Sequence, residues 1–193
     1  MVDALVVGLG NPGSRYAGPR HNVGADTVVA LVERCGDRLR TDKQVSAEVA
    51  RVRMDAHSVV LAVPTTFMND SGRSLSQLVR RHRPGEMSEV VVVHDELDLE
   101  QGVVKVKRGG GLAGHNGLRS IEAHLHTRDF TRVRIGVGKP PGGAERGADW
   151  VLSKVSGTTR EVLEESVNRA ADAVERIVSE GVDAAMAEFN ARR

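Results

Sequence analysis

Short apolar segments alternate along this chain with segments of helical periodicity, and this alternation limits the possible folds more than any other feature. The expected strands lie at residues 3–9, about 45–53, 58–63, 90–93, 104–107 and 131–137. The expected helices end near Gly36, span about 72–82 and 117–126, and fill about 158–193. Strands that alternate with helices predict an α/β sandwich, in which helices cover both faces of a twisted mixed β-sheet.

The chain is expected to form a single domain over residues 1–193, since this length suits one core and no linker or repeat divides it. A Gly/Pro-rich segment at about 138–149 is expected to be a mobile loop. No apolar run approaches the roughly 20 residues of a membrane span, and no signal peptide is apparent, so a cytoplasmic location is expected. The single cysteine, Cys35, agrees with a reducing compartment, and its place on an apolar helix stripe predicts burial.

The net charge is only +1, but the charges are unevenly distributed. Residues 101–140 contain eight Lys or Arg and two Asp or Glu. Lys105 and Lys107 alternate along one expected strand, and Arg132 and Arg134 alternate along another, so each pair shares a strand face. Such a local excess suggests a surface that binds anions such as phosphates, although an ordinary solvated face has the same composition.

Polar residues cluster in four loops that follow expected strands. The loops run from Gly8 to Asn22, from Pro64 to Asn69, from His94 to Asp98, and from Gly109 to Gly117. Because ligands bind at strand-end loops in open α/β sheets, all four are expected to surround one cleft. Each polar residue also has an ordinary explanation, since loop histidines are often surface residues and Asn and Asp often serve turn geometry. Their joint occurrence favours a site.

The chemistry of these loops favours direct attack by water on a carbonyl group. The Gly-x-Gly-x-x-Gly pattern that begins at Gly8 would suit a dinucleotide-dependent oxidoreductase, but no helix opens at its last glycine. The chain has no Gly-x-Ser-x-Gly nucleophile motif. Metal ligation is poorly supported, because His124 and His126 point apart on a helix and no P-loop accompanies the acids of the third loop. A histidine, an aspartate and several asparagines remain as base, orienting carboxylate and amide donors.

Five ordered motifs resemble those of bacterial peptidyl-tRNA hydrolases, over about residues 3–155. They are Gly8-Leu9-Gly10-Asn11-Pro12-Gly13 with Tyr16 and Arg20-His21-Asn22, then Pro64-Thr65-Thr66-Phe67-Met68-Asn69, His94-Asp95-Glu96-Leu97-Asp98, Gly114-His115-Asn116-Gly117-Leu118, and Arg132-Val133-Arg134-Ile135-Gly136-Val137-Gly138. The resemblance implies hydrolysis of the ester between a peptide and tRNA. The rival functions are those of a non-catalytic RNA-binding relative, such as the homologue that acts in intron splicing in plant organelles, and of the oxidoreductase.

The resemblance also implies residue roles. His21 would activate water, Asp95 would orient and stabilise His21, and Asn11 would help to distinguish blocked from free amino groups. The implied substrate contacts come from Asn11, Asn69, Asn116, Tyr16 and Phe67 for the peptide and the tRNA 3′ end, and from Lys105, Lys107 and Arg134 for tRNA phosphates. No metal or organic cofactor is implied, and the partner would be the acceptor stem and 3′ end of peptidyl-tRNA, bound by a monomer with a lid at 138–149.

Two positions depart from the family pattern. Ala113 stands where the family usually has glycine, which matters if that position needs a positive φ. Trp150 stands where phenylalanine is usual, and it is expected to alter the packing at the base of the lid.

Overall fold

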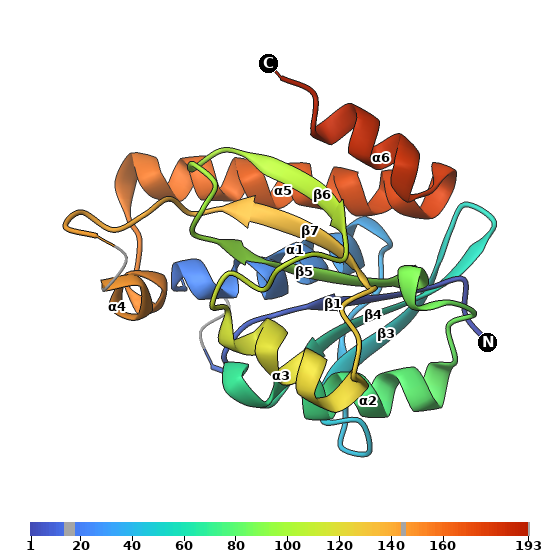
Figure 1. Ribbon diagram of the computed structural model, residues 1–193. Coiled ribbons are helices and arrows are strands. Elements are labelled where there is room, and N and C mark those ends of the chain that lie inside the picture. The colour runs from blue at the N-terminus through green and yellow to red at the C-terminus, as the bar shows by residue number, and fades with distance from the viewer. Residues whose placement is uncertain (14–17, 144–145, 193) are drawn as a thin grey trace.

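A computed structural model describes residues 1–13, 18–143 and 146–192 (Figure 1). Seven strands form one sheet in the order β2-β3-β4-β1-β5-β7-β6. The strands are β1 (Ala4–Gly8), β2 (Arg40–Asp42), β3 (Ala47–Met54), β4 (His57–Pro64), β5 (Val90–Glu96), β6 (Val104–Arg108) and β7 (Thr131–Gly136). The helices are α1 (Val23–Arg34), α2 (Ser71–His82), α3 (Asn116–Leu125), α4 (Gly147–Leu152), α5 (Gly157–Glu180) and α6 (Val182–Phe189), with short 3-10 helices η1 (Arg20–Asn22), η2 (Met68–Asp70) and η3 (Met87–Glu89).

The sheet is mixed, as predicted. Its four inner strands, β4, β1, β5 and β7, run parallel to one another. The outer strands β3 and β6 pair antiparallel with β4 and β7, and β2 pairs antiparallel with β3. Because the inner strands are parallel, their carboxyl ends lie at the same edge of the sheet. The polar loops that leave β1, β4 and β5 therefore begin side by side.

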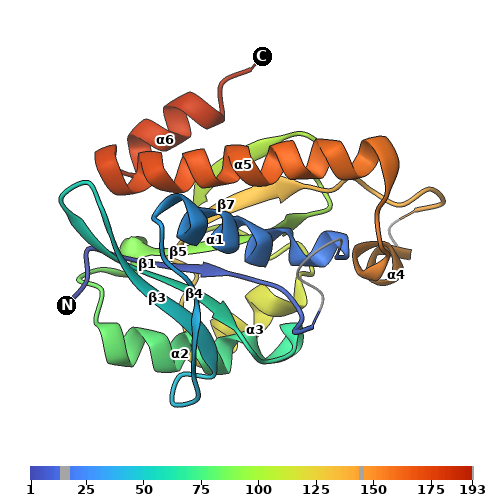
Figure 2. The same ribbon diagram turned by 180° about the vertical axis from the view of Figure 1, so that it is seen from behind.

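Helices cover both faces of the sheet (Figures 1 and 2). On one face α1, α5 and α6 bury an apolar cluster with the side chains of alternate strand residues, such as Val6, Val91 and Val133. On the other face α2 and α3 bury a second cluster that includes Val7 and Val92. Neighbouring residues of one strand enter opposite clusters, which is why the inner strands read as continuous apolar runs. The α/β sandwich predicted from the sequence is confirmed.

One local prediction was wrong, and another stays a prediction. The mobility expected at 138–149 is the one that stays a prediction, and the end of that segment belongs to α4, which begins at Gly147 and buries Val151. Cys35 is exposed rather than buried. It follows the last residue of α1 and stands directly before Gly36, which has a φ of 66°, so it lies at the exposed end of the helix. No helix among the residues described is long and apolar enough to cross a membrane.

Candidate active site

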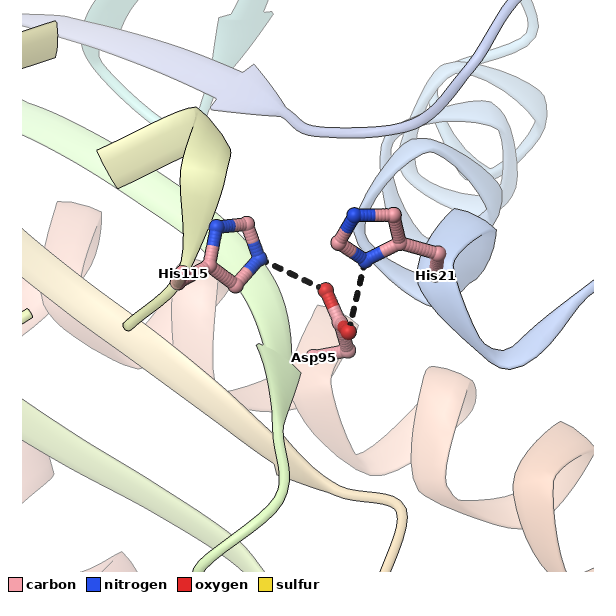
Figure 3. Close-up of side chains that lie close together, drawn as sticks. All are labelled: His21, Asp95 and His115. Atoms are coloured by element: carbon pink, nitrogen blue, oxygen red, sulfur yellow. Dashed lines mark hydrogen bonds and ion pairs between the residues drawn. The ribbon is translucent and has the colours of Figure 1, made fainter. Parts of the chain in front are cut away.

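His21 and Asp95 meet at the carboxyl edge of the sheet (Figure 3). His21 lies in η1, directly before α1, and Asp95 lies near the end of β5. Gly24 permits this meeting, since a Cβ at that position would lie 2.2 Å from the carbonyl oxygen of Val93. The start of α1 can therefore approach the end of β5 closely. His21 Nδ1 lies 2.7 Å from Asp95 Oδ2, and both side chains are buried.

A second histidine, His115, contacts the other oxygen of the same carboxylate. Its Nε2 lies 2.8 Å from Asp95 Oδ1. His115 is the N-cap of α3, and its Nδ1 accepts hydrogen bonds from the backbone N–H groups of Gly117 and Leu118, at 3.1 and 3.3 Å. Because Nδ1 is an acceptor, the ring proton must be on Nε2, which donates to Asp95. The helix cap thus fixes the tautomer of His115.

Asp95 is an ionised acceptor between two rings. Burial alone would raise its pKa, but electrostatic attraction to His115 and His21 and the hydrogen bonds from their rings outweigh that effect and hold the pKa of Asp95 well below its ordinary value. A carboxylate can only accept, so the proton shared with His21 is on Nδ1 of that ring. In the neutral form of this ring the lone pair is therefore on Nε2, and no hydrogen bond joins Nε2 to another of the described residues.

His21 borders two adjoining hollows at this edge of the sheet, with volumes of about 320 and 340 Å³. All four polar loops contribute to their walls, together with α4 and the segment before it. The side chains that line the second hollow include Asn11, Phe67, Asn69 and Asn116. The loops that the sequence places after separate strands therefore surround one region, and His21 lies where the two hollows meet.

Asn11 is held rigidly in the first loop. Its Oδ1 accepts a hydrogen bond from the backbone N–H of Met68 at 2.8 Å. Its backbone N–H donates to Asn22 Oδ1 at 2.9 Å, and its carbonyl accepts from Asn22 Nδ2 at 3.2 Å. Because Oδ1 is occupied, the Asn11 side chain offers mainly its NH₂ group to the hollow.

The other expected substrate contacts are more exposed. The Phe67 side chain is 70% exposed and lines the second hollow with Asn69 and Asn116, which are also exposed. Asn116 is the first residue of α3, next to His115. Tyr16 lies outside the described residues, so the structure does not place it.

The basic side chains lie farther along the sheet. Lys105 pairs directly with Arg134 and Lys107 with Arg132 in the antiparallel ladder of β6 and β7, so all four side chains share one sheet face. Lys105, Lys107 and Arg134 are partly exposed. Arg134 also lies 3.7 Å from Glu96. Arg132, however, is only 1% exposed, which corrects the expectation that it shares an open face with Arg134.

His21, Asp95 and His115 are close enough together to be considered as metal ligands. Their spacing argues otherwise, because two ligands bound to zinc at about 2.0–2.1 Å lie roughly 3.3 Å apart in a tetrahedral site. The two N···O distances of 2.7 and 2.8 Å are those of hydrogen bonds instead. The acids of the third loop do not converge either, since Glu96 faces Arg132 and Arg134 whereas Asp98 faces Lys139.

The two departures from the family pattern have structural consequences. Ala113 has a φ of 50°, so the position does adopt the left-handed conformation that glycine tolerates best. The indole N–H of Trp150 lies 3.2 and 3.1 Å from the carbonyl oxygens of Val137 and Gly138, bonds that phenylalanine cannot make. The guanidinium of Arg20 stacks on the Trp150 ring at 3.6 Å and donates to its carbonyl. Trp150 thereby ties α4 to both the end of β7 and η1.

Sequence reasoning missed the contact between His115 and Asp95. Capping rules pointed elsewhere, because Asn116 is the preferred residue type and the expected N-cap of a helix over about 117–126, whereas the helix begins at Asn116 and His115 caps it. It also missed the link between Arg20 and Trp150, which are 130 residues apart in the chain. No local pattern points to that second contact.

Comparisons with known proteins agree with this geometry. A family model described as peptidyl-tRNA hydrolase matches residues 5–193. Relatives named peptidyl-tRNA hydrolase include one from Cutibacterium acnes, 46% identical over 96% of this chain and 97% of the relative, and one from Nocardia farcinica, 47% identical over 97% and 96%.

Solved structures give the same result. The crystal structure of peptidyl-tRNA hydrolase from Acinetobacter baumannii is 37% identical, with a TM-score of 0.90 over 98% of this chain and 95% of that chain. A crystal structure of peptidyl-tRNA hydrolase in complex with N-propanol matches equally well. The protein therefore belongs to the peptidyl-tRNA hydrolase family.

Proposed function

We propose that the protein hydrolyses the ester bond between a peptide, or an N-blocked amino acid, and tRNA, with His21 as the general base that activates water. The observation that carries the proposal is the carboxylate of Asp95 held between two imidazole rings, of which only His21 keeps a free ring nitrogen toward the hollows. A neutral ring with its lone pair in a cleft can take a proton from water.

The reaction follows from this arrangement. Nε2 of His21 removes a proton as water attacks the ester carbonyl, and the negative Asp95 stabilises the imidazolium that forms. The tetrahedral intermediate then collapses: the bond to the ribose oxygen of the tRNA breaks, and the imidazolium returns its proton to that leaving oxygen. His115 is excluded as the base, because Nδ1 caps α3 and Nε2 donates to Asp95. The bond from His115 also keeps the carboxylate oriented toward His21. General-base assistance is typically worth about 10²–10⁴-fold in rate.

The amide groups around the hollows provide the other requirements. Asn11, Asn69 and Asn116 lie within the same hollow and can donate to the oxyanion or bind the peptide. The free NH₂ group of Asn11 suits a carbonyl oxygen of the substrate's peptide unit. A free α-ammonium group offers donors only, so it would meet a donor and would also have to lose its water. Asn11 thus favours N-blocked substrates over ordinary aminoacyl-tRNA.

The tRNA is proposed to extend from the hollows toward Lys105, Lys107 and Arg134, which are positively charged and partly exposed on one sheet face. Backbone contacts position a nucleic acid without reading its sequence, which suits an enzyme that acts on many tRNAs. The acceptor stem and 3′ end would be the parts bound. The enzyme is proposed to act as a cytoplasmic monomer without a metal. Closure of the 138–149 segment as a lid stays a prediction, and Lys139, Pro140 and Gly147 already line the first hollow.

A direct test is incubation of the protein with N-acetylaminoacyl-tRNA and, separately, with the same aminoacyl-tRNA unblocked. We expect catalytic release of the N-acetylamino acid and intact tRNA from the first substrate and much slower release from the second. Tight binding of both without turnover would support the non-catalytic RNA-binding function. If the protein neither binds nor hydrolyses these substrates, the proposed substrate is rejected.

A further inference from the structure

Arg132 makes a set of buried contacts that the proposed mechanism does not use. It is the largest of the fully buried side chains in the described chain. Its guanidinium donates from NH1 to the carbonyl oxygens of Gly111, at 2.6 Å, and Gly109, at 3.3 Å, and from Nε to His94 Nε2, at 3.2 Å. A buried guanidinium that binds backbone carbonyls holds those carbonyls in place.

The two carbonyls belong to the loop that leads to His115 and Asn116. This loop has little intrinsic stiffness, since four of its residues have positive φ: Gly109, Gly110, Ala113 and Gly114, at 63, 98, 50 and 73°. Glycines lose more conformational freedom on folding than other residues, so an ordered loop of this kind needs contacts from outside. Arg132 lies on β7, inside the sheet, and provides them.

His94 extends the same network to Asp95. It is fully buried, and its Nδ1 lies 2.8 Å from the carbonyl oxygen of Asp95. Because Arg132 donates to Nε2, the His94 proton is on Nδ1 and is donated to that carbonyl. The His94 ring also packs edge-on against His115, with centroids 5.1 Å apart. Arg132 therefore contacts, directly or through His94, the two backbone segments that carry Asp95 and His115.

We propose that Arg132 is a positioning residue, which clamps the glycine-rich loop 109–114 so that His115 can hold Asp95 in line with His21. The inference rests on the proposed function, because it assigns the clamp a role in that reaction. It also gives Arg132 a different role from Arg134, its neighbour on the same sheet face. Arg134 is partly exposed and can contact a ligand. A phosphate could not reach the Arg132 guanidinium without the loss of its two carbonyl partners.

The test compares Arg132→Met with the matched control Arg128→Met, which removes an exposed arginine paired with Glu122. In Arg132→Met, kcat on N-acetylaminoacyl-tRNA should fall by on the order of 10²-fold, the effect of a misplaced catalytic group, with KM within about twofold. Amide hydrogen exchange should accelerate at least about tenfold at residues 110–118, where local opening becomes easier. The control should change none of these values.

Two further variants distinguish an effect on the loop from a general failure to fold. Gly111→Ala adds a methyl group that meets no atom within 4 Å at a residue without positive φ, so it should stiffen the loop. Combined with Arg132→Met it should restore part of the lost kcat and slow amide exchange at residues 110–118. Gly→Ala can also stabilise the whole fold, so restored kcat without slower exchange in this loop would count against the clamp. If Arg132→Met fails to fold, Arg132→Lys replaces it and should show a smaller loss, because lysine keeps the charge but not the fork.

Three results would overturn the proposal. One is an unchanged kcat with faster loop exchange, and another is unchanged loop exchange. The third is a raised KM with a salt slope of tRNA binding lower by about 1, which would make Arg132 a phosphate ligand. Hydrogen exchange is measured without substrate. It therefore tests the clamp even if the wild-type protein shows no turnover and the proposed function is rejected.

Discussion

Replacement of Asp95 by asparagine should reverse the tautomer of His21. Asn has the shape of Asp, but one oxygen becomes an NH₂ group. The capped Nδ1 of His115 keeps its ring proton on Nε2, so the amide oxygen must face His115. The NH₂ group then faces Nδ1 of His21, which must become the acceptor. The ring proton moves to Nε2, and the nitrogen that faces the hollows can no longer accept a proton from water.

The expected fall in kcat can be estimated from the contribution of general-base assistance. General-base assistance contributes about 10²–10⁴-fold, and the corresponding substitution in a Ser-His-Asp triad lowers kcat by about 10⁴. We therefore expect Asp95→Asn to lower kcat by about 10³–10⁴, or roughly 4–5.5 kcal/mol of transition-state stabilisation. Both hydrogen bonds to position 95 survive in weaker, uncharged form. The free energy of unfolding should thus fall by no more than about 2 kcal/mol, and the protein should stay folded.

The assay combines single-turnover hydrolysis of N-acetylaminoacyl-tRNA with ¹⁵N NMR of the imidazole nitrogens in mildly alkaline solution. Wild-type His21 should carry its proton on Nδ1, and the Asp95→Asn variant should carry it on Nε2. Asp129→Asn, at an exposed position, serves as the control and should match the wild type. A variant that keeps the proton on Nδ1, or that hydrolyses the substrate within tenfold of the wild-type rate, would show that Asp95 does not act by setting the tautomer of His21.

Three other predictions follow from named contacts. Asn11→Asp keeps the bond from the Met68 N–H but replaces the free NH₂ group by a negative oxygen, so the kcat/KM ratio of blocked to unblocked aminoacyl-tRNA should fall; a constant ratio would remove Asn11 from selection. Joint replacement of Lys105 and Lys107 by alanine should raise KM and reduce the salt slope of tRNA binding by about 2 at most, and an unchanged slope would make them solvated surface. Burial, with help from His115 and Arg132, lowers the pKa of His94 well below its unfolded value, so the unfolded state binds this proton first as the pH falls. The free energy of unfolding should therefore be unaffected by His94 above about pH 6.5 and decline below it, by up to about 1.4 kcal/mol per pH unit. Urea unfolding of His94→Gln should lack this decline, and identical pH profiles of the variant and the wild type would contradict the assignment.

The periodicity of the sequence predicts most of the fold because each strand and helix is specified locally. Val90–Val93 reads as a buried inner strand, and both neighbours of that strand are indeed inner strands. Cys35 is an exception, because the periodicity of apolar residues does not define where a helix ends. Its i+7 spacing is correct for the helix face, but the helix ends one residue earlier, and helix ends are poorly specified by periodicity.

The sequence predicted which loops carry the residues of the candidate site, but not the contacts between those residues. Strand-end position places His21 and Asp95 near each other, because parallel strands bring their loops to one edge. It does not reveal that His115 shares the carboxylate or that Arg132 is buried. Both facts depend on tertiary contacts: His115 reaches Asp95 only through the cap of α3, and Arg132 is covered by a loop 21 residues away in the chain. A sequence pattern gives the face of an arginine but not what covers that face.

The most direct test of His21 as the general base is the turnover of N-acetylaminoacyl-tRNA by His21→Ala, with tRNA affinity measured in parallel. Loss of the proposed base should lower kcat by roughly 10²–10⁴-fold and leave tRNA binding nearly unchanged, since the proposed phosphate contacts lie elsewhere. Neither histidine next to the site can take over, because both ring nitrogens of His115 are engaged and His94 is buried. Near-normal turnover by His21→Ala would contradict the account.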